Sequence, residues 1–114
     1  MADESNTRQF GYRLPRAAVP YSVRIEILGN DGENFIRVRG IDISASGIAI
    51  ALTEPIQLNE AVELAIHCRD GEIARIRGQV SHQSEDRFGL EFAFKSADER
   101  RPIEDLVAQI IKTV

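Results

Sequence analysis

Alternating hydrophobic and polar residues dominate the middle of the chain and predict short β-strands with one buried face. The clearest run is the last one, in which Phe88, Leu90, Phe92 and Phe94 alternate with small and charged residues. The same period occurs in residues 23–27, 35–43, 48–52, 62–68, 76–80 and 88–94. The pattern therefore predicts six strands.

Turn residues separate several of these strands. Residues 30–32 read Asn-Asp-Gly, and residues 69–72 read Arg-Asp-Gly-Glu. Glycine beside a short polar residue is typical of tight hairpin connections. Neighbouring strands are therefore expected to pair in antiparallel order.

The period changes at Ser96, where Ser96 and Glu99 have the spacing of a helix-capping box. Apolar residues then recur at spacings of three and four, which is typical of a helix with one buried face. They are Ile103, Leu106, Val107, Ile110, Ile111 and Val114. This spacing predicts a C-terminal helix over about residues 97–113.

Six short antiparallel strands with one apolar face are most simply closed into a small β-barrel or curled into a sandwich, since closure removes exposed strand edges. The predicted fold class is therefore mostly β, and of the two we expect the barrel, with six antiparallel strands and a C-terminal α-helix. A chain of 114 residues, 43% hydrophobic, suits one such domain. We expect residues 1–11 to form a flexible N-terminal arm and residues 12–114 to form the barrel domain.

The charge balance and the single cysteine exclude several classes of function. A net charge of −4 gives no general attraction to a nucleic acid polymer or to an anionic membrane. One cysteine, Cys68, leaves no intramolecular disulfide and no multi-cysteine zinc site, so no metal is expected. The longest apolar run, residues 47–52, is far shorter than a membrane span. We expect a cytoplasmic protein without membrane insertion.

Two other readings of the charged and nucleophilic residues have little support. His67 and Cys68 are neighbours on a predicted strand and so face opposite sides, which separates a nucleophile from its base. We therefore expect no enzyme. His82 is placed near a turn and exposed to solvent. A barrel that binds RNA or single-stranded DNA would use arginines of several strands, namely Arg24, Arg37, Arg39, Arg75 and Arg77. The acidic total and the core-like spacing of the phenylalanines disfavour this function.

Arginines are concentrated near the N-terminus, where no acidic residue lies between Ser5 and Arg24. Arg8, Arg13 and Arg16 stand in this segment. Such a segment suits an anionic ligand of modest size.

Asp42, Ser44 and Gly47 form an Asp-x-Ser-x-x-Gly sequence between two predicted strands. A purely local interpretation is available. Aspartate and serine side chains satisfy backbone groups where a strand ends, and glycine permits the positive φ of a bend.

Three features of the sequence, taken together, are typical of one known domain family. Pro15 and Arg16 precede the first strand, the Asp-x-Ser-x-x-Gly sequence ends the second, and residues 89–92 read Gly-Leu-Glu-Phe in the last strand before the helix. This combination resembles the PilZ domain, a bacterial six-stranded barrel with a C-terminal helix that is a receptor for the second messenger cyclic di-GMP. The resemblance covers residues 12 to about 112.

The resemblance implies a ligand site in two parts. In the arginine stretch before the barrel, Arg16 matches the last arginine, Arg13 an often basic position between, and Tyr12 stands where the first arginine is expected. Arg13 and Arg16 would pair with phosphate and with the edge of guanine. Arg8 and Tyr12 are possible accessory residues, the latter by stacking on a base.

The second part is the Asp-x-Ser-x-x-Gly sequence. By the resemblance, Asp42 would accept hydrogen bonds from guanine N1 and N2, and Ser44 would reach a phosphate or a base. Gly47 would let a base approach the backbone. No cofactor is implied besides the ligand, cyclic di-GMP.

The resemblance predicts a stand-alone bacterial cyclic di-GMP receptor whose N-terminal arm changes conformation on binding. Its signal would pass to a partner protein that controls motility, biofilm or exopolysaccharide. The alternative is a degenerate PilZ domain that does not bind the nucleotide and serves as a protein interaction module. Tyr12 motivates this alternative, because it supplies no charge where the family has an arginine.

Overall fold

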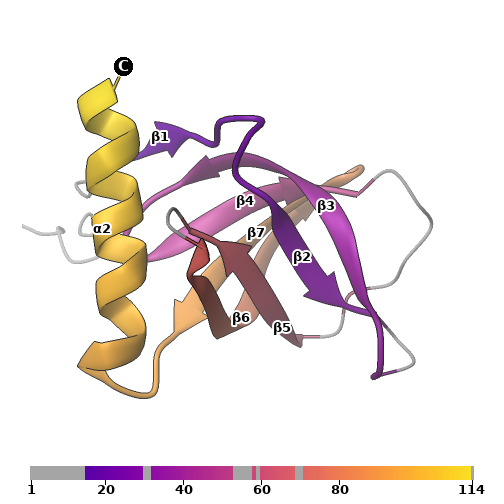
Figure 1. Cartoon of the computed structure of the whole chain (residues 1–114). Helices are drawn as coiled ribbons and strands as arrows, with labels where there is room; N and C mark the ends of the chain where they lie inside the picture. Colours follow the sequence, from indigo (N-terminus) through magenta and orange to yellow (C-terminus); the bar gives the residue numbers. More distant parts are fainter. Residues whose placement is uncertain (1–14, 30–31, 53–57, 59, 69–70, 114) are drawn as a thin grey trace, which may run out of the picture.

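The computed structural model describes residues 15–29, 32–52, 58, 60–68 and 71–113 (Figure 1). The expected arm, residues 1–11, lies outside the described residues. The described elements are β1 (Ala17–Ala18), β2 (Ile25–Leu28), β3 (Phe35–Ile43), β4 (Gly47–Ala51), β5 (Ala61–His67), β6 (Ile73–Ser84), β7 (Arg87–Ala93) and α2 (Ala97–Thr113).

Six of these strands form a closed antiparallel barrel. Strand β3 pairs with β2, and the order continues through β5, β6, β7 and β4, which returns to pair with β3. The predicted fold class, a six-stranded barrel with a C-terminal helix, is confirmed. Strand β1 was not predicted, because two residues are too few to show an alternation. It pairs with the end of β3, Ala17 opposite Ile43 and Ala18 opposite Asp42.

The core lies between the inner faces of the strands and α2. Alternate residues of the strands, such as Ile25, Ile27 and Ile50, are completely buried. The helix packs against β6 and β1 and covers one side of the barrel (Figure 1). Ile111 was expected in the buried stripe but is 42% exposed, because it lies about 100° around the helix from Ile110, and Val114 lies outside the described residues. The buried stripe consists of Ile103, Leu106, Val107 and Ile110, as predicted. Each such side chain contributes about 1.5 to 3 kcal/mol through removal of apolar surface from water.

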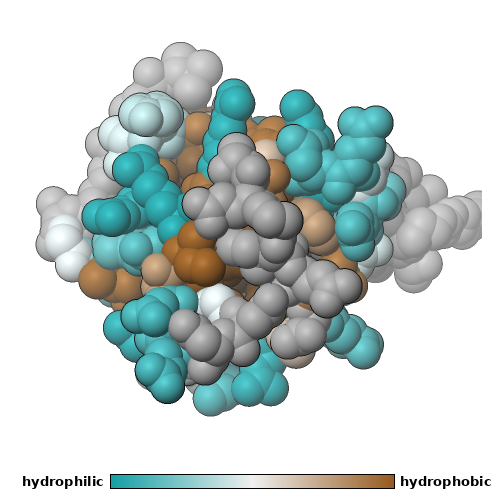
Figure 2. All heavy atoms as spheres, turned by 90° about the vertical axis from the view of Figure 1, so that its right-hand side faces the viewer, coloured by the Kyte–Doolittle hydropathy of each residue, from teal (hydrophilic) through white to brown (hydrophobic). Residues whose placement is uncertain are grey.

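The side of the molecule turned away from α2 has a different surface. Hydrophobic residues lie in the middle of that face and hydrophilic residues surround them (Figure 2). In the part of the chain that the structure describes, no helix is both long enough and apolar enough to cross a membrane.

The connections β2–β3 and β5–β6 have the predicted glycine chemistry. Gly32 has a φ of 73° and Gly71 a φ of 78°, values that side chains disfavour. Asn30 and Asp31, the other predicted residues of the first turn, lie outside the described residues, as do Arg69 and Asp70 of the second.

Each of two strands contains an extra residue that changes which side chains face outward. The register of β3 shifts between Gly40 and Asp42, and that of β6 shifts between Val80 and His82. Such β-bulges place two residues opposite one and re-aim the side chains that follow. His82 lies near the end of strand β6, three residues before the turn at Glu85, so its expected place near a turn and its exposure to solvent are both confirmed.

Candidate functional site

Asp42 faces outward because of the bulge in β3. Val38 is buried and faces the core, so an uninterrupted alternation would also direct Gly40 and Asp42 inward. The extra residue, Ile41, reverses the alternation and brings the Asp42 side chain to the surface, where it is 37% exposed. The bulge thus makes a carboxylate available at a position that would otherwise belong to the core.

Small residues surround this carboxylate. Asp42 lies opposite Ala18 of β1 on one side and Ala49 of β4 on the other. Ala49 lies opposite Gly89 of β7, which lies opposite His82 of β6. We refer to these five residues as the outer row. Its middle carries no side chain larger than a methyl group, so the surface beside Asp42 is low and accessible.

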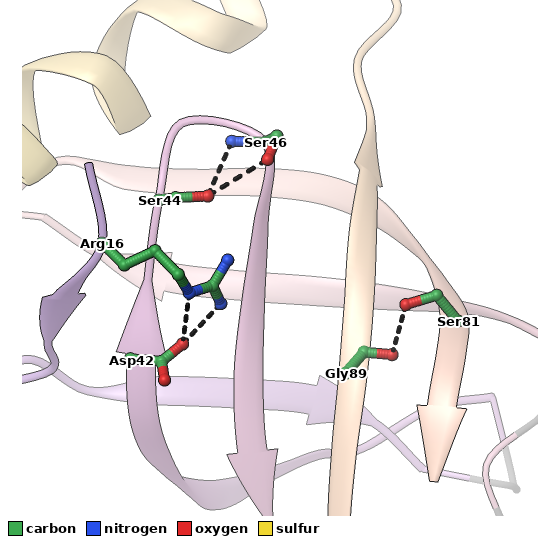
Figure 3. A network of polar contacts seen from close by, with 6 residues as sticks. All are labelled: Arg16, Asp42, Ser44, Ser46, Ser81 and Gly89. Carbon is green, nitrogen blue, oxygen red and sulfur yellow. Dashed lines mark hydrogen bonds and ion pairs between the residues drawn. The ribbon is translucent and has the colours of Figure 1, made fainter. Parts of the chain in front are cut away.

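Arg16 lies directly against Asp42. Its Nε and Nη2 atoms both donate hydrogen bonds to Oδ1 of Asp42, at 3.1 Å and 2.5 Å (Figure 3). The pairing of Ala17 and Ala18 with the end of β3 brings these two residues, 26 positions apart, into contact. The side chains are 42% and 37% exposed, so solvent limits the stabilisation to about 1 kcal/mol or less.

The ion pair leaves further hydrogen-bonding capacity in both groups. A guanidinium has five N–H donors and a carboxylate has two oxygens that each accept more than one hydrogen bond. The pair therefore presents donors and acceptors side by side on one surface. Such a surface suits a ligand that carries both an anionic group and a hydrogen-bonding base edge.

Ser44 lies in the interior, beneath the turn that joins β3 to β4. Its side chain is completely buried, and its Oγ accepts a hydrogen bond from the amide of Ser46 at 3.2 Å and lies 3.1 Å from Ser46 Oγ (Figure 3). Its amide donates to the carbonyl of Gly47 at 2.9 Å. Ser44 thus shapes the turn, in agreement with the local interpretation. A contact from Ser44 to a ligand stays a prediction.

Gly47 begins β4, and its glycine is required by strand packing rather than by a bend. A Cβ at this position would lie 2.5 Å from the carbonyl oxygen of Leu90 on β7. Its φ is not positive, so the expectation of a positive φ at Gly47 was wrong. The absence of a side chain lets β7 approach β4 closely beside the Asp42 turn.

Four of the predicted site residues therefore meet at one corner of the barrel: Arg16, Asp42, Ser44 and Gly47. Arg16 and Asp42 lie on the surface, and Ser44 and Gly47 support them from below. Arg8, Tyr12 and Arg13 lie outside the described residues.

The sequence did not predict that Ser81 and His82 lie beside Gly89 at the far end of the outer row. The bulge in β6 places both Ser81 and His82 opposite Gly89, and Ser81 Oγ donates to the carbonyl of Gly89 at 3.2 Å (Figure 3). A Cβ on Gly89 would approach His82 Cβ to 3.4 Å. The only signal in the sequence was a glycine within an otherwise regular strand, which is a known mark of bulges.

The groups considered for catalysis have structural partners. His67 Nε2 lies 2.6 Å from Glu26 Oε1, and Cys68 Sγ donates to the carbonyl of Ile66. Burial, and then the nearby charge of Glu72, raise the pKa of the Cys68 thiol, which keeps it protonated near neutral pH. The described residues contain no group of three or more side chains suited to bind a metal ion.

Comparison with solved structures identifies the same fold in several proteins. The PilZ domain of CeSA from a cellulose-synthesizing bacterium matches with a TM-score of 0.64 and 18% identity, over 85% of this chain and 98% of that one. The PilZ domain with c-di-GMP of YcgR from Escherichia coli matches with a TM-score of 0.70 and 14% identity, over 89% and 92%. MrkH of K. pneumonia matches with a TM-score of 0.69 and 17% identity, over 87% of this chain and 48% of that one.

Sequence comparison gives the family. Among curated proteins, none matches this chain. The family model for the PilZ domain matches residues 6–109, which include the whole barrel and most of α2. The chain therefore belongs to the PilZ domain family, a family of cyclic di-GMP receptors.

Proposed function

We propose that this protein is a receptor for cyclic di-GMP and that the nucleotide binds at the corner formed by Arg16 and Asp42. The single observation that carries the proposal is the contact between these two residues. They come from the two separate parts of the family's ligand motif, and they lie side by side on the surface. The PilZ domain of YcgR, which has the same fold, is described with c-di-GMP.

The chemistry of the corner suits this ligand. Arg16 would donate hydrogen bonds to a phosphate or to the O6/N7 edge of guanine, and Asp42 would accept them from guanine N1 and N2. The small middle of the outer row leaves space for a flat base beside Asp42. Because the exposed ion pair contributes about 1 kcal/mol or less, exchanging part of it for ligand contacts costs little.

The remaining motif residues have supporting roles in this proposal. Ser44 and Gly47 hold the β3–β4 turn and the approach of β7, and so fix the position of Asp42. Arg13 would add a second guanidinium for the phosphates, with Arg8 and Tyr12 as accessory contacts. A bound nucleotide would then order the arginine-containing segment that precedes β1.

The same binding event would produce a signal. Ordering of the segment before β1 would create a new surface beside the barrel, to be recognised by a partner protein. We place this receptor in the bacterial cytoplasm, with a partner that acts in motility, biofilm formation or exopolysaccharide synthesis.

A second candidate function is a PilZ domain without nucleotide, which serves as an interaction module. The observation that favours it is Tyr12, which stands at the position of the first motif arginine. Losing one bidentate guanidinium contact costs about 1 to 3 kcal/mol, or roughly tenfold to more than a hundredfold in affinity.

Calorimetric titration with cyclic di-GMP tests the proposal. We expect saturable binding by the wild type, its loss in both Arg16→Ala and Asp42→Ala, and its retention in Arg101→Ala, a matched control on the exposed side of α2. Heat of dilution alone with the wild type would refute the receptor function. If Tyr12→Arg then restored binding, the missing charge at this position would be the reason that the wild type does not bind, as the second candidate requires.

A further inference from the structure

A hollow of about 480 Å³ opens on the barrel surface beside strand β1. Residues 18–21 and Val23, from β1 and its connection to β2, form one wall, and residues 37–41 of β3 form the other. Strand β2 pairs with β3 only as far as Val38, and β1 pairs with it only from Asp42. The hollow lies between these two pairings, where the connection loops from β1 to β2 (Figure 1).

The interior of the hollow is largely aliphatic. Val23 and Val38 are buried and belong to the core, and Val19 and Ile41 are partly buried above them. A Cβ on Gly40 would lie 2.8 Å from Cγ1 of Val19, so the missing side chain is what allows Val19 to rest against β3. The shape of the hollow therefore depends on the packing of Val19 against β3, which the absence of a side chain at Gly40 allows.

The rim of the hollow is basic and aromatic. Arg37 and Arg39 are exposed and point outward from the same face of β3, about 7 Å apart along the strand. Among the residues that the structure describes, no acidic side chain lines the hollow and no carboxylate forms an ion pair with either arginine. The Arg37 guanidinium lies 5.6 Å from the ring centroid of Tyr21, whose side chain is 90% exposed.

We propose that this hollow docks an acidic segment of a partner protein, with an apolar side chain in the aliphatic interior and carboxylates on Arg37 and Arg39. Two arginines that pair with no described carboxylate, beside an apolar surface, are complementary to this chemistry, although Arg37 also donates a hydrogen bond to the carbonyl of Tyr21 at 3.5 Å. A nucleic acid fits less well, because the chain is acidic overall and the apolar surface is concave. The inference goes beyond the nucleotide site: the hollow adjoins the outer row at Ala18, but it contains neither Arg16 nor Asp42.

The test is a titration of the isotopically labelled full chain, without nucleotide, followed by amide chemical shifts. The probe is a blocked hexapeptide, Glu-Glu-Leu-Phe-Glu-Glu. We expect saturable shifts at Val19, Tyr21, Gly40 and Ile41. Two control peptides separate the contributions: Gln-Gln-Leu-Phe-Gln-Gln lacks the charge, and Glu-Glu-Ser-Ser-Glu-Glu lacks the apolar side chains. Each control should bind at least about tenfold more weakly.

A charge reversal provides the matched pair of variants. Arg39→Glu should weaken binding of the acidic peptide at least about tenfold. Arg77→Glu, an identical change at an exposed position of β6, should leave the affinity unchanged. Native shift dispersion establishes that both variants fold.

Two results of the peptide titration would overturn the docking proposal: no shifts at the hollow with the wild type, or equal weakening by both variants. In a separate competition experiment, displacement of the peptide from the hollow by cyclic di-GMP would also overturn it. That displacement would assign the hollow to the nucleotide site. Because the peptide titration contains no nucleotide, its result is independent of whether the protein binds cyclic di-GMP.

Discussion

Two carboxylates on the outer surface of the same barrel contact a basic residue in or beside a neighbouring strand, and the two contacts differ in burial and in the backbone that carries them. Arg16 and Asp42 join the two-residue strand β1 to a bulged part of β3, with side chains 42% and 37% exposed. Glu26 and His67 join β2 to β5, which pair in regular register, with side chains 17% and 30% exposed.

The two carboxylates also differ in the number of basic side chains that contact them. Glu26 lies between two groups, with Oε1 at 2.6 Å from His67 and Oε2 at 3.5 Å from Arg24. Asp42 is held through one oxygen by one arginine. A half-buried carboxylate between two partners on regular strands stabilises the sheet. An exposed ion pair on an irregular strand costs little free energy to separate. A ligand that replaces part of the pair needs this low cost.

The largest expected difference concerns nucleotide affinity. Asp42→Ala should weaken binding of cyclic di-GMP at least about a hundredfold, because the acceptor for guanine N1 and N2 is lost. Glu26→Ala should change the affinity less than about twofold. Calorimetry on both variants measures this, and equal losses would contradict the distinction between the two pairs.

Gly47 should be the most sensitive position of the corner in stability. Gly47→Ala places a methyl group against the Leu90 carbonyl, and separation of β4 from β7 should lower the free energy of unfolding by about 2 kcal/mol. Chemical denaturation measures the change. Gly71→Ala, at a turn with open space but a positive φ, serves as the comparison and should cost only about 1 kcal/mol. If Gly47→Ala left the free energy of unfolding unchanged, β7 would be able to move away from β4 without loss of stability, which would contradict this prediction.

The two carboxylates should also differ in their contribution to stability, in the opposite order to their effect on binding. Glu26→Ala removes a short, half-buried hydrogen bond and should lower the free energy of unfolding by about 1 to 2 kcal/mol. Asp42→Ala should lower it by less than about 1 kcal/mol. Urea denaturation of the two variants distinguishes them, and a larger loss for Asp42→Ala would assign the Arg16 pair a structural role.

The smallest expected effect is on Cys68, the neighbour of His67. Its pKa is raised above the usual value of 9.0 by burial and by Glu72, so the folded protein holds the thiol proton more tightly than the unfolded chain does. The resulting stability is fully present below pH 9 and is lost as the pH rises through the folded pKa. Alkylation by iodoacetamide at pH 8 should be slower in the folded protein than in urea. Equal rates would contradict the burial of the thiol.

The regular parts of the fold were predictable because they follow a period. Alternation of apolar residues identified the six barrel strands, and spacings of three and four identified α2. Polar turn residues with glycine identified the β2–β3 and β5–β6 hairpins, and Gly32 and Gly71 have the positive φ that such turns need. These features are local, so the sequence expresses them directly.

The irregular parts were not predictable, and they are the parts that make the site. A bulge adds one residue without changing the composition, so nothing in the order Gly40, Ile41, Asp42 showed which side chain would turn outward. The direct contact of Arg16 with Asp42 depends on strand β1, which is too short for a periodic signal. The packing role of Gly47 depends on Leu90 of β7, 43 residues further along the chain. The inward position of Ser44 depends on the geometry of the β3–β4 turn, where its side chain meets Ser46.

The most direct test of the central claim is a titration of the labelled protein with cyclic di-GMP, followed by amide chemical shifts. The account predicts saturable shifts at Arg16, Ala18, Asp42 and Ala49, with no comparable change at Glu26 or His67. Saturable shifts on the Glu26 face with an unchanged Arg16–Asp42 corner, or no shifts at all, would contradict it.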